Sequence, residues 1–228
     1  MFYVDRGVEV LATSESKEYN QALDFLIESR RSTRKFKLDI PPREVVEQII
    51  RAGLLAPYSG LAVFRDGFRR FVVVLRESKS TVQVAALLKR RISNLCKQLE
   101  TQMEQNTFMR EHGQAFLHNL KTMSQHGIPN VGKAPYYIVV AEQKGMPQVE
   151  QLSLAHCMQN MWLKATALSL GFQLLSITAQ VSEDREFCSL VDIPFGQFAL
   201  DGCLIGYADI IPPPSKRPRA DEVTRWID

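Results

Sequence analysis

The sequence predicts a layered domain of the α/β or α+β class, in which helices and strands alternate along the chain. Two runs of β-branched and aromatic residues, FVVVL at 71–75 and PYYIVVA at 135–141, are typical of strands. Segments whose apolar residues recur with helical spacing precede, separate and follow them. Of the 228 residues, 45% are apolar and 23% are charged, which is a globular balance. We therefore expect one domain over residues 1–228 with a full core.

The first third of the chain predicts two helices and a strand. After a short arm, apolar residues at 22, 23, 26 and 27 predict a helix over 20–28. Pro42 suits the first position of a second helix, because its missing N–H costs nothing there, and Pro57 ends that helix. The apolar stripe of this helix consists of Val45, Val46, Ile49, Ile50 and Leu54. Residues 57–70 form a loop before the strand at 71–75, whose unbroken apolarity indicates burial on both faces.

Residues 79–126 are polar and helix-prone, with Gly113 as the only breaker. Their apolar residues predict two amphipathic helices. The stripes are Leu87, Leu88, Ile92, Leu95 and Leu99 in the first helix, and Phe108, Phe116, Leu117 and Leu120 in the second. One interpretation is an ordinary helical pair packed on the core. The other is an insertion that covers a pocket or a partner subunit, with Met103, Met109 and Met123 as adaptable apolar surface.

The second half of the chain alternates helices with strands. It predicts a turn-rich link at 127–134, a strand at 135–141, a helix at 149–170, a strand-like FQLLSIT, a short helix at 182–190, a strand at 198–207 and a basic, proline-rich tail at 208–228. The helix at 149–170 is apolar on several sides, which indicates a central, buried position. Gly171 is the expected C′ residue of this helix, and Ser182 the expected N-cap of the next.

The densest group of charged residues is the basic segment, residues 29–35 (SRRSTRK). Guanidinium forks, hydroxyl groups and loop N–H groups are what a pocket for a phosphate needs. The plainer interpretation is a solvated cationic surface. A second basic group, Lys216, Arg217 and Arg219, either converges with the basic segment on one anion or forms a solubilising tail.

Bulk properties exclude several classes of protein. A net charge of +3 is too small to indicate nucleic-acid binding. No apolar run approaches the roughly 20 residues that cross a bilayer, and Asp5, Arg6 and Glu9 do not fit a signal peptide. The four cysteines are far apart, as expected for reduced thiols in a cytoplasmic protein. We expect a cytoplasmic protein that binds neither nucleic acid nor a membrane.

Motifs of several common active sites are missing. The four histidines, at 112, 118, 126 and 156, lack a metal-ligand arrangement. In a helix, His156 and Cys157 point about 100° apart, so they do not form a nucleophile–base pair. Cys157 is expected to be a small core residue. The chain has no P-loop, no G-x-S-x-G and no G-x-G-x-x-G motif.

Several short motifs follow one another in a specific order. The first part of the chain has RRSTRKF at 30–36, LAP at 55–57 and FVVV at 71–74. The second part has Ala134-Pro135, Gln159-Asn160, Leu170-Gly171, Gly206-Tyr207, prolines at 212–214, and Glu222-Val223 with Trp226. In order and spacing these motifs resemble the nitroreductase family of FMN-dependent oxidoreductases. The resemblance covers about residues 20–75 and 134–228.

The resemblance implies an α+β fold, a three-layer α/β/α sandwich with a mixed central sheet, and an intertwined homodimer that holds FMN at its interface. The implied FMN contacts are Arg30, Arg31, Ser32, Arg34, Pro57, Tyr58, Ser59, Gln159, Ile177, Thr178, Lys216, Arg217 and Arg219. The residues from 30 to 32 would hold the phosphate and ribityl end, and the tail cations would close on the phosphate. Arg34 would lie near the pyrimidine edge, and Ile177 and Thr178 near the reactive nitrogen.

The loop at 57–70 differs from the family pattern. The family loop P-S-x-x-N-x-Q-P-W is about four residues shorter, and its Asn and Gln-Pro-Trp are absent here. Ser59 stands one place from the family serine. The insertion at 79–126 corresponds to a region that often forms a lid over the substrate pocket in the family.

The resemblance implies an FMN-dependent NAD(P)H oxidoreductase that reduces a small organic acceptor, such as a nitroaromatic or a quinone, by ping-pong hydride transfer. No side chain is assigned as a catalytic acid, and Arg34 near the ring is the candidate for charge stabilisation. Two alternatives are a specialised flavin reaction on the same fold and a flavin-binding protein without turnover.

Overall fold

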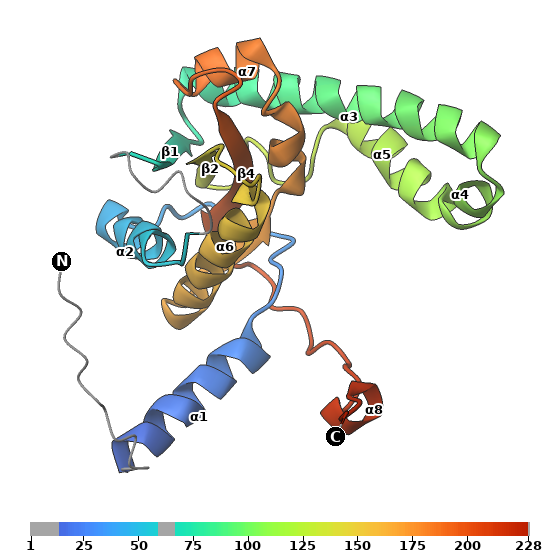
Figure 1. Ribbon diagram of the computed structural model, residues 1–228. Helices are drawn as coiled ribbons and strands as arrows, with labels where there is room; N and C mark the ends of the chain where they lie inside the picture. Colours follow the sequence, from blue (N-terminus) through green and yellow to red (C-terminus); the bar gives the residue numbers. More distant parts are fainter. Residues whose placement is uncertain (1–13, 59–66, 228) are drawn as a thin grey trace. The chain divides into compact units, whose positions relative to one another are not determined.

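The computed structural model describes residues 14–58 and 67–227 (Figure 1). The chain divides into a larger unit, Arg31–Pro212, and a smaller unit made of Met1–Arg30 and Pro213–Asp228. The smaller unit contains the helices α1 (Ser14–Ser29) and α8 (Ala220–Val223). Helix α1 ends at Ser29 as predicted, and it begins earlier than the expected residue 20. The expectation of a single domain stays a prediction.

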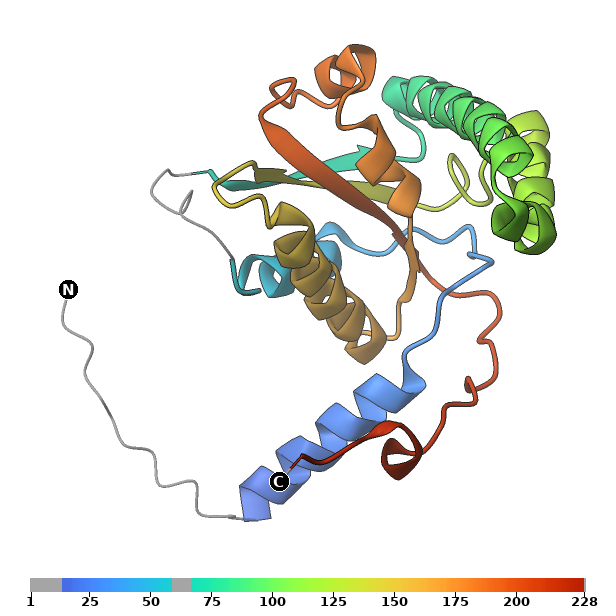
Figure 2. The same ribbon diagram turned by 45° about the vertical axis from the view of Figure 1, so that its right-hand side comes forward.

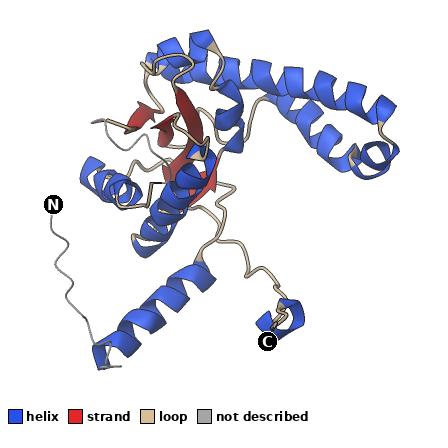
Figure 3. Ribbon diagram, viewed as in Figure 1, coloured by secondary structure: helices blue, strands red, loops and turns tan. Residues whose placement is uncertain are grey.

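The larger unit is built on a four-stranded sheet (Figure 3). The strands are β1 (Arg69–Leu75), β2 (Tyr136–Gln143), β3 (Gly171–Leu174) and β4 (Phe198–Gly206). Their order is β1-β2-β4-β3, and all three neighbouring pairs are antiparallel. An isolated parallel bridge between Ser32 and Phe172 adds a parallel component at the β3 edge.

Helices cover both faces of this sheet, as the three-layer prediction requires (Figure 2). One face packs on α2 (Arg43–Leu54) and α6 (Glu150–Ala167). The other packs on α3 (Lys79–Gln105), α5 (Gln114–His126), the 3₁₀ helix η2 (Ser176–Val181) and α7 (Arg185–Leu190). Side chains of β2 pack alternately into the two cores, because successive side chains of a strand point to opposite faces of the sheet. Ile138 belongs to the first core and Val139 to the second, and both are fully buried.

The expected burial of β1 on both faces is wrong. Val73 and Leu75 are 38% and 50% exposed, whereas Val74 is buried. The physical reason is position in the sheet: β1 is an edge strand that pairs only with β2 among the described strands. An apolar run of this kind predicts a β-strand. It does not predict whether other elements cover both faces of that strand.

Two predicted helix boundaries are also corrected. Helix α6 ends at Ala167, and Ser169 takes the left-handed conformation with φ +57°, so Gly171 is not the C′ residue. Gly171 instead begins β3, where an added Cβ would lie 2.5 Å from Thr33 Oγ1. The short helix α7 is capped by Asp184, whose carboxylate accepts the Phe187 N–H at 3.0 Å, and not by Ser182.

The insertion at 79–126 forms three helices, because α4 (Thr107–His112) lies between the two expected ones. Helices α3 and α5 run side by side and carry α4 at their far end (Figure 1). Their inner sides join the core, with Leu88 and Leu120 buried. The leucines of both predicted stripes therefore face the core, but Phe108 and Phe116, which the second stripe included, are exposed, and Phe108 lies in α4.

Candidate functional site

Residues 31–35 of the basic segment lie along the β3 edge of the sheet. The Thr33 N–H donates to the Phe172 carbonyl at 2.9 Å, and the Phe172 N–H donates to Thr33 Oγ1 at 3.1 Å. Ser32 forms the parallel bridge with the same strand. Thr33 is 3% exposed and packs directly against Gly171. Any side chain at position 171 would collide with Thr33. The backbone of the basic segment is thus held in place by β3.

Side chains from α6 and from the segment that follows β4 add to this support. The Trp162 Nε1–H donates to the Arg31 carbonyl at 3.2 Å, and its ring stacks on Phe172 with centroids 5.0 Å apart. Lys35 forms an ion pair with Asp209 at 2.8 Å. This hydrogen bond raises the pKa of Lys35 and lowers the pKa of Asp209. Lys35 therefore has its counter-charge within the protein, and the predicted phosphate contacts would fall to other cations of the basic segment.

Asn130, which no sequence motif marked, positions the backbone at Arg34. Its Nδ2 donates to the Arg34 carbonyl at 3.1 Å and to Gln173 Oε1 at 2.7 Å. Gln173 is buried and donates to the Pro129 carbonyl at 3.4 Å. Asn130 adopts φ +69°, a conformation that Asn tolerates better than most residues. The only local signal for this role was an Asn within a link rich in Gly and Pro.

A cavity of about 820 Å³ adjoins Arg34. Helices α3, α4 and α5 form one wall, and the segment from β3 to η2 forms the other. The lining residues are Arg34, Ile92, Leu95, Gln98, Leu99, Gln102, Phe108, Met109, His112, Gly113, Phe116, Leu120, Met123, Ile128, Pro129, Gln173, Leu174, Leu175, Ser176, Ile177 and Gln180. Its volume lies within the usual range of small-molecule sites, roughly 300–1,000 Å³. Two predicted contacts far apart in sequence, Arg34 and Ile177, meet in this cavity.

Thr178 faces the interior of the protein, although it adjoins Ile177 in the sequence. Its hydroxyl shares a 2.8 Å hydrogen bond with the Tyr137 hydroxyl, and its N–H donates to the Leu175 carbonyl at 2.9 Å. The side chain is fully buried. Thr178 thus serves the fold of η2 in this structure, and its predicted contact with FMN stays a prediction.

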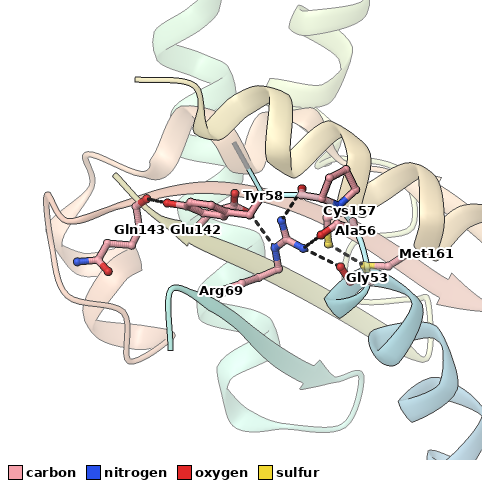
Figure 4. A network of polar contacts seen from close by, with 9 residues as sticks. Gly53, Ala56, Tyr58, Arg69, Glu142, Gln143, Cys157 and Met161 are labelled. Atoms are coloured by element: carbon pink, nitrogen blue, oxygen red, sulfur yellow. Dashed lines mark hydrogen bonds and ion pairs between the residues drawn. The ribbon is translucent and has the colours of Figure 1, made fainter. Parts of the chain in front are cut away.

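A buried ion pair between Arg69 and Glu142 lies beneath the start of the 57–70 loop (Figure 4). Arg69 Nε donates to Glu142 Oε2 at 2.8 Å, and both side chains are at most 1% exposed. The guanidinium also donates to the carbonyls of Gly53, Ala56 and Pro57 at 2.8, 3.1 and 3.4 Å. Arg69 therefore holds the C-terminal end of α2 and the first loop residue. The pair joins positions 73 residues apart, so no local pattern reveals it.

The described part of the 57–70 loop packs on the sheet. Tyr58 donates its hydroxyl to the Gln143 carbonyl at 3.3 Å, and its ring meets Phe68 edge-on at 4.6 Å. Pro57 is exposed, and neither Pro57 nor Tyr58 lines the cavity. Ser59 lies outside the described residues. Contacts of this loop with FMN stay a prediction.

Cys157 of α6 is the small core residue that its sequence context predicted, whereas the predicted contact of Gln159 with FMN stays a prediction. Cys157 is fully buried, and burial raises the pKa of its thiol to about 12, which is unsuited to a nucleophile. It packs against Met161 and against the close-packed Gly53 of α2 (Figure 4). All four cysteines are buried free thiols. Gln159 is exposed on this helix and does not line the cavity.

The remaining predicted residues belong to the smaller unit. Arg30 follows α1, with its N–H donating to the Leu26 carbonyl at 3.0 Å. Lys216 and Arg217 are exposed. Arg219 forms a two-point ion pair with Asp221, at 2.8 and 3.0 Å, at the start of α8. The convergence of the two basic groups on one anion stays a prediction.

The described residues contain neither a group of metal ligands nor a helix that could span a membrane. Within residues 14–58 and 67–227, no group of His, Cys, Asp and Glu has the arrangement of a metal site. No helix in these same ranges combines the length and apolarity that crossing a bilayer needs.

Several solved structures with the same fold contain bound FMN. A nitroreductase with bound FMN from Bacteroides fragilis NCTC 9343 matches with a TM-score of 0.64 and 18% identity, over 90% of this chain and 98% of that one. A nitroreductase with bound FMN from Desulfitobacterium hafniense DCB-2 gives 0.65 and 19%, over 90% and 98%. An oxidised iodotyrosine deiodinase bound to FMN and 3-iodo-L-tyrosine gives 0.65 and 22%, over 90% and 99%.

The family model for the nitroreductase family matches residues 27–207. The chain therefore belongs to the nitroreductase family, as its motifs indicated. A search of curated proteins finds no match. The matched range spans the basic segment, the sheet, the helical insertion and the cavity.

Proposed function

We propose that this protein is an FMN-dependent NAD(P)H oxidoreductase that reduces a small organic acceptor. The supporting observation is that the basic segment, supported by β3, brings Arg34 to the wall of an apolar cavity in a fold of the nitroreductase family. FMN needs such a pairing, because its phosphate is anionic and its ring system is flat and largely apolar. The structural relatives carry FMN.

The chemistry of the donor set fits this cofactor. Arg31 and Ser32 offer a cation and a hydroxyl on adjacent residues, which suits the phosphate and the ribityl chain. Arg34 would lie beside the ring, next to the apolar wall formed by α3 and α5. Arg30 and the tail cations Lys216 and Arg217 would complete the phosphate site, and Arg219 would join them only by giving up its ion pair with Asp221.

Bound FMN would supply the redox chemistry, namely uptake of a hydride from NAD(P)H and reduction of the acceptor in a separate half-reaction. The protein contributes binding, orientation and charge. Arg34 would stabilise the negative charge that develops at the pyrimidine edge. The Asn130 hydrogen bond to the Arg34 carbonyl would hold the backbone of this residue in place. The apolar wall formed by α3 and α5 would exclude water from a ring bound beside it.

We further propose that two copies of the chain assemble around the cofactor. Large apolar residues are exposed on α1 and the tail, including Tyr19 (72%), Phe25 (68%), Trp226 (86%) and Ile227 (88%). Exposed apolar surface of this extent is typical of an interface. Pro57, Tyr58 and Gln159 would then contact the FMN held by the partner. The buried, reduced cysteines favour a reducing compartment such as the cytoplasm.

The test begins with the absorbance spectrum of the purified protein. We expect flavin bands that bleach when NADH or NADPH is added without oxygen. Protein that stays colourless and does not take up FMN would refute the proposal, and bound flavin that neither nucleotide bleaches would favour a flavin-binding protein without turnover. Arg30→Ala should weaken FMN retention by roughly 2–3 kcal/mol through loss of a charged hydrogen bond. Arg43→Ala is the control, because this arginine is exposed and pairs with Glu47 on the surface of α2.

A further inference from the structure

The position of Arg34 depends on its backbone, because its side chain is long and exposed. The neighbouring residues Thr33 and Lys35 are held by backbone hydrogen bonds to β3 and to the segment that follows β4, each of 2.9 Å. The Arg34 carbonyl between them instead accepts a hydrogen bond from a side chain, Nδ2 of Asn130, at 3.1 Å. A single side-chain amide therefore holds the main chain at the residue whose charge matters most for the proposed function.

Asn130 is itself fixed in a tight turn between α5 and β2. Its carbonyl accepts the N–H groups of Lys133 and Ala134 at 3.0 and 2.9 Å, and its φ is +69°. Asn is among the few residues with a side chain that adopt this left-handed conformation readily. The turn thus presents the Asn130 amide to Arg34 from a backbone that two hydrogen bonds already hold.

The hydrogen bonds of Gln173 explain why residue 130 is an amide and not a carboxylate. Gln173 is buried, and its Nε2 donates to the Pro129 carbonyl at 3.4 Å, which leaves its Oε1 to Asn130. Asn130 Nδ2 donates to this oxygen at 2.7 Å and to the Arg34 carbonyl. An amide NH₂ group has two N–H bonds, and here both meet acceptors. A carboxylate at position 130 would bring a third acceptor to the same place and no donor.

Asn130 supports the cavity wall without being part of it. Arg34, Pro129 and Gln173 line the cavity, whereas Asn130 does not. Its side chain joins the basic segment to β3, and its backbone continues the link that follows α5. Any influence of Asn130 on a molecule bound in the cavity must therefore act through the residues that it holds.

We propose that Asn130 is a positioning residue that raises the affinity of the site for reduced FMN by holding Arg34 at the cavity wall. This inference rests on the proposed function, in which Arg34 stabilises the negative charge of the reduced ring. That stabilisation weakens with distance, and a cation that is held in place beforehand needs no reorganisation. Reduced and oxidised FMN differ in this charge, so the ratio of their affinities reports the placement of the guanidinium.

The first measurement is hydrogen exchange of the full chain without FMN. Asn130→Gly removes the amide and keeps the positive φ, which glycine adopts without strain. Exchange in peptides that span residues 31–37 should become about threefold faster or more, because the segment loses a hydrogen bond. Asn130→Asp keeps the size of the side chain but has no N–H donor, so it should have the same effect. Exchange as slow as in the original protein, in either variant, would overturn the inference.

A matched control separates this effect from a general effect of glycine in a turn. Asp192 also has a positive φ, +52°, is exposed and lies outside the cavity. Asp192→Gly should leave exchange at residues 31–37 unchanged. An equal increase in Asp192→Gly would show that the effect does not come from the Asn130 amide, and the inference would be wrong.

The second measurement is the reduction potential of FMN bound to the full chain, from anaerobic titration against a reference dye at saturating FMN. Arg34→Gln removes the charge and leaves the carbonyl that Asn130 holds, so the two changes can be combined. We expect the ratio of the affinities for reduced and oxidised FMN to fall about tenfold in Arg34→Gln, which is about 30 mV for a two-electron couple. In Asn130→Gly it should fall about threefold. Adding Asn130→Gly to Arg34→Gln should change it less than about 1.5-fold, because Asn130 acts through the missing charge.

The outcomes distinguish this inference from the proposed function. Protein that binds no FMN refutes the proposed function and the inference with it. With FMN bound, an unchanged ratio in Asn130→Gly or in Arg34→Gln overturns the inference alone. The same holds if the threefold fall persists in the Arg34→Gln background, since Asn130 would then act by another route. A merely structural role would lower the urea midpoint of Asn130→Gly and leave the ratio as it was.

Discussion

Removal of the Arg69 guanidinium should be among the most destabilising single changes in this protein. In Arg69→Met, Glu142 stays buried without a counter-charge, since its side chain is fully inaccessible and its second oxygen, Oε1, already lacks a hydrogen-bond partner. Three carbonyls, at Gly53, Ala56 and Pro57, also lose their donor. Breaking a buried pair from one side costs about 3–5 kcal/mol. This is a large fraction of the roughly 5–15 kcal/mol that stabilises an ordinary domain.

The double variant tests the cause of the loss. Glu142→Leu alone leaves Arg69 buried with its carbonyl acceptors and no anion, and it should cost about 3 kcal/mol. Arg69→Met combined with Glu142→Leu removes both charges, so its unfolding free energy should return to within about 1–2 kcal/mol of the original protein. Urea unfolding followed by far-UV circular dichroism measures all three variants.

Two results would refute this reasoning. A cost below about 1 kcal/mol for Arg69→Met would show that the buried charge is not what makes the arginine necessary. A double variant less stable than either single variant would show that the pair contributes net stability. FMN retention gives a separate signal, because the double variant regains stability without regaining the bonds to Ala56 and Pro57. We expect its FMN affinity to stay reduced if the 57–70 loop contacts the cofactor.

Two further changes test local features. Burial raises the pKa of Asp201 from 3.8 to about 6, so the native state holds its proton more tightly than the unfolded chain and stability falls as pH rises from about 4 to about 6. Asp201→Asn should flatten this slope and add about 1–2 kcal/mol at neutral pH, and an unchanged slope in urea unfolding would contradict the assignment. Gly171→Ala should cost about 1–3 kcal/mol, because its Cβ would lie 2.5 Å from Thr33 Oγ1. Thermal unfolding measures this cost, which should shrink when Thr33→Ala makes room; full additivity of the two changes would argue against the contact.

The amino-acid sequence by itself determined the kind and approximate place of most elements. Apolar periodicity gave the stripe of α2, where Val46 and Ile49 are buried. The central, buried position expected for the helix at 149–170 is wrong for the single chain, because α6 packs on one face of the sheet and its Leu152 is 60% exposed. The spacing of the cysteines was consistent with free thiols, and all four are free and buried. The order of short motifs indicated the family, which the match over residues 27–207 confirms. Apolar periodicity repeats over a few residues, and the motifs follow one another in a fixed order. Both can therefore be read from one amino-acid sequence.

The sequence predicted the residues that cap and end the helices less accurately than it predicted the helices themselves. Ser182 and Asp184 are both good N-cap residues only two positions apart, and the structure uses Asp184. Gly171 fitted a helix end, yet glycine is needed there because Thr33 approaches the backbone from another part of the chain. In each case the residue type was informative, and the deciding contact came from outside the local segment.

Tertiary structure alone decided the edge position of β1, the ion pair beneath the loop and the composition of the cavity. Arg69 and Glu142 meet because β1 and β2 are antiparallel neighbours in a register that places these two residues opposite each other. Arg34 and Asn130 are 96 positions apart and meet only when the basic segment lies along β3. The cavity unites helices of the 79–126 insertion with the segment between β3 and η2. Such contacts depend on strand pairing and helix packing between distant segments, and local periodicity carries no record of which segments will meet.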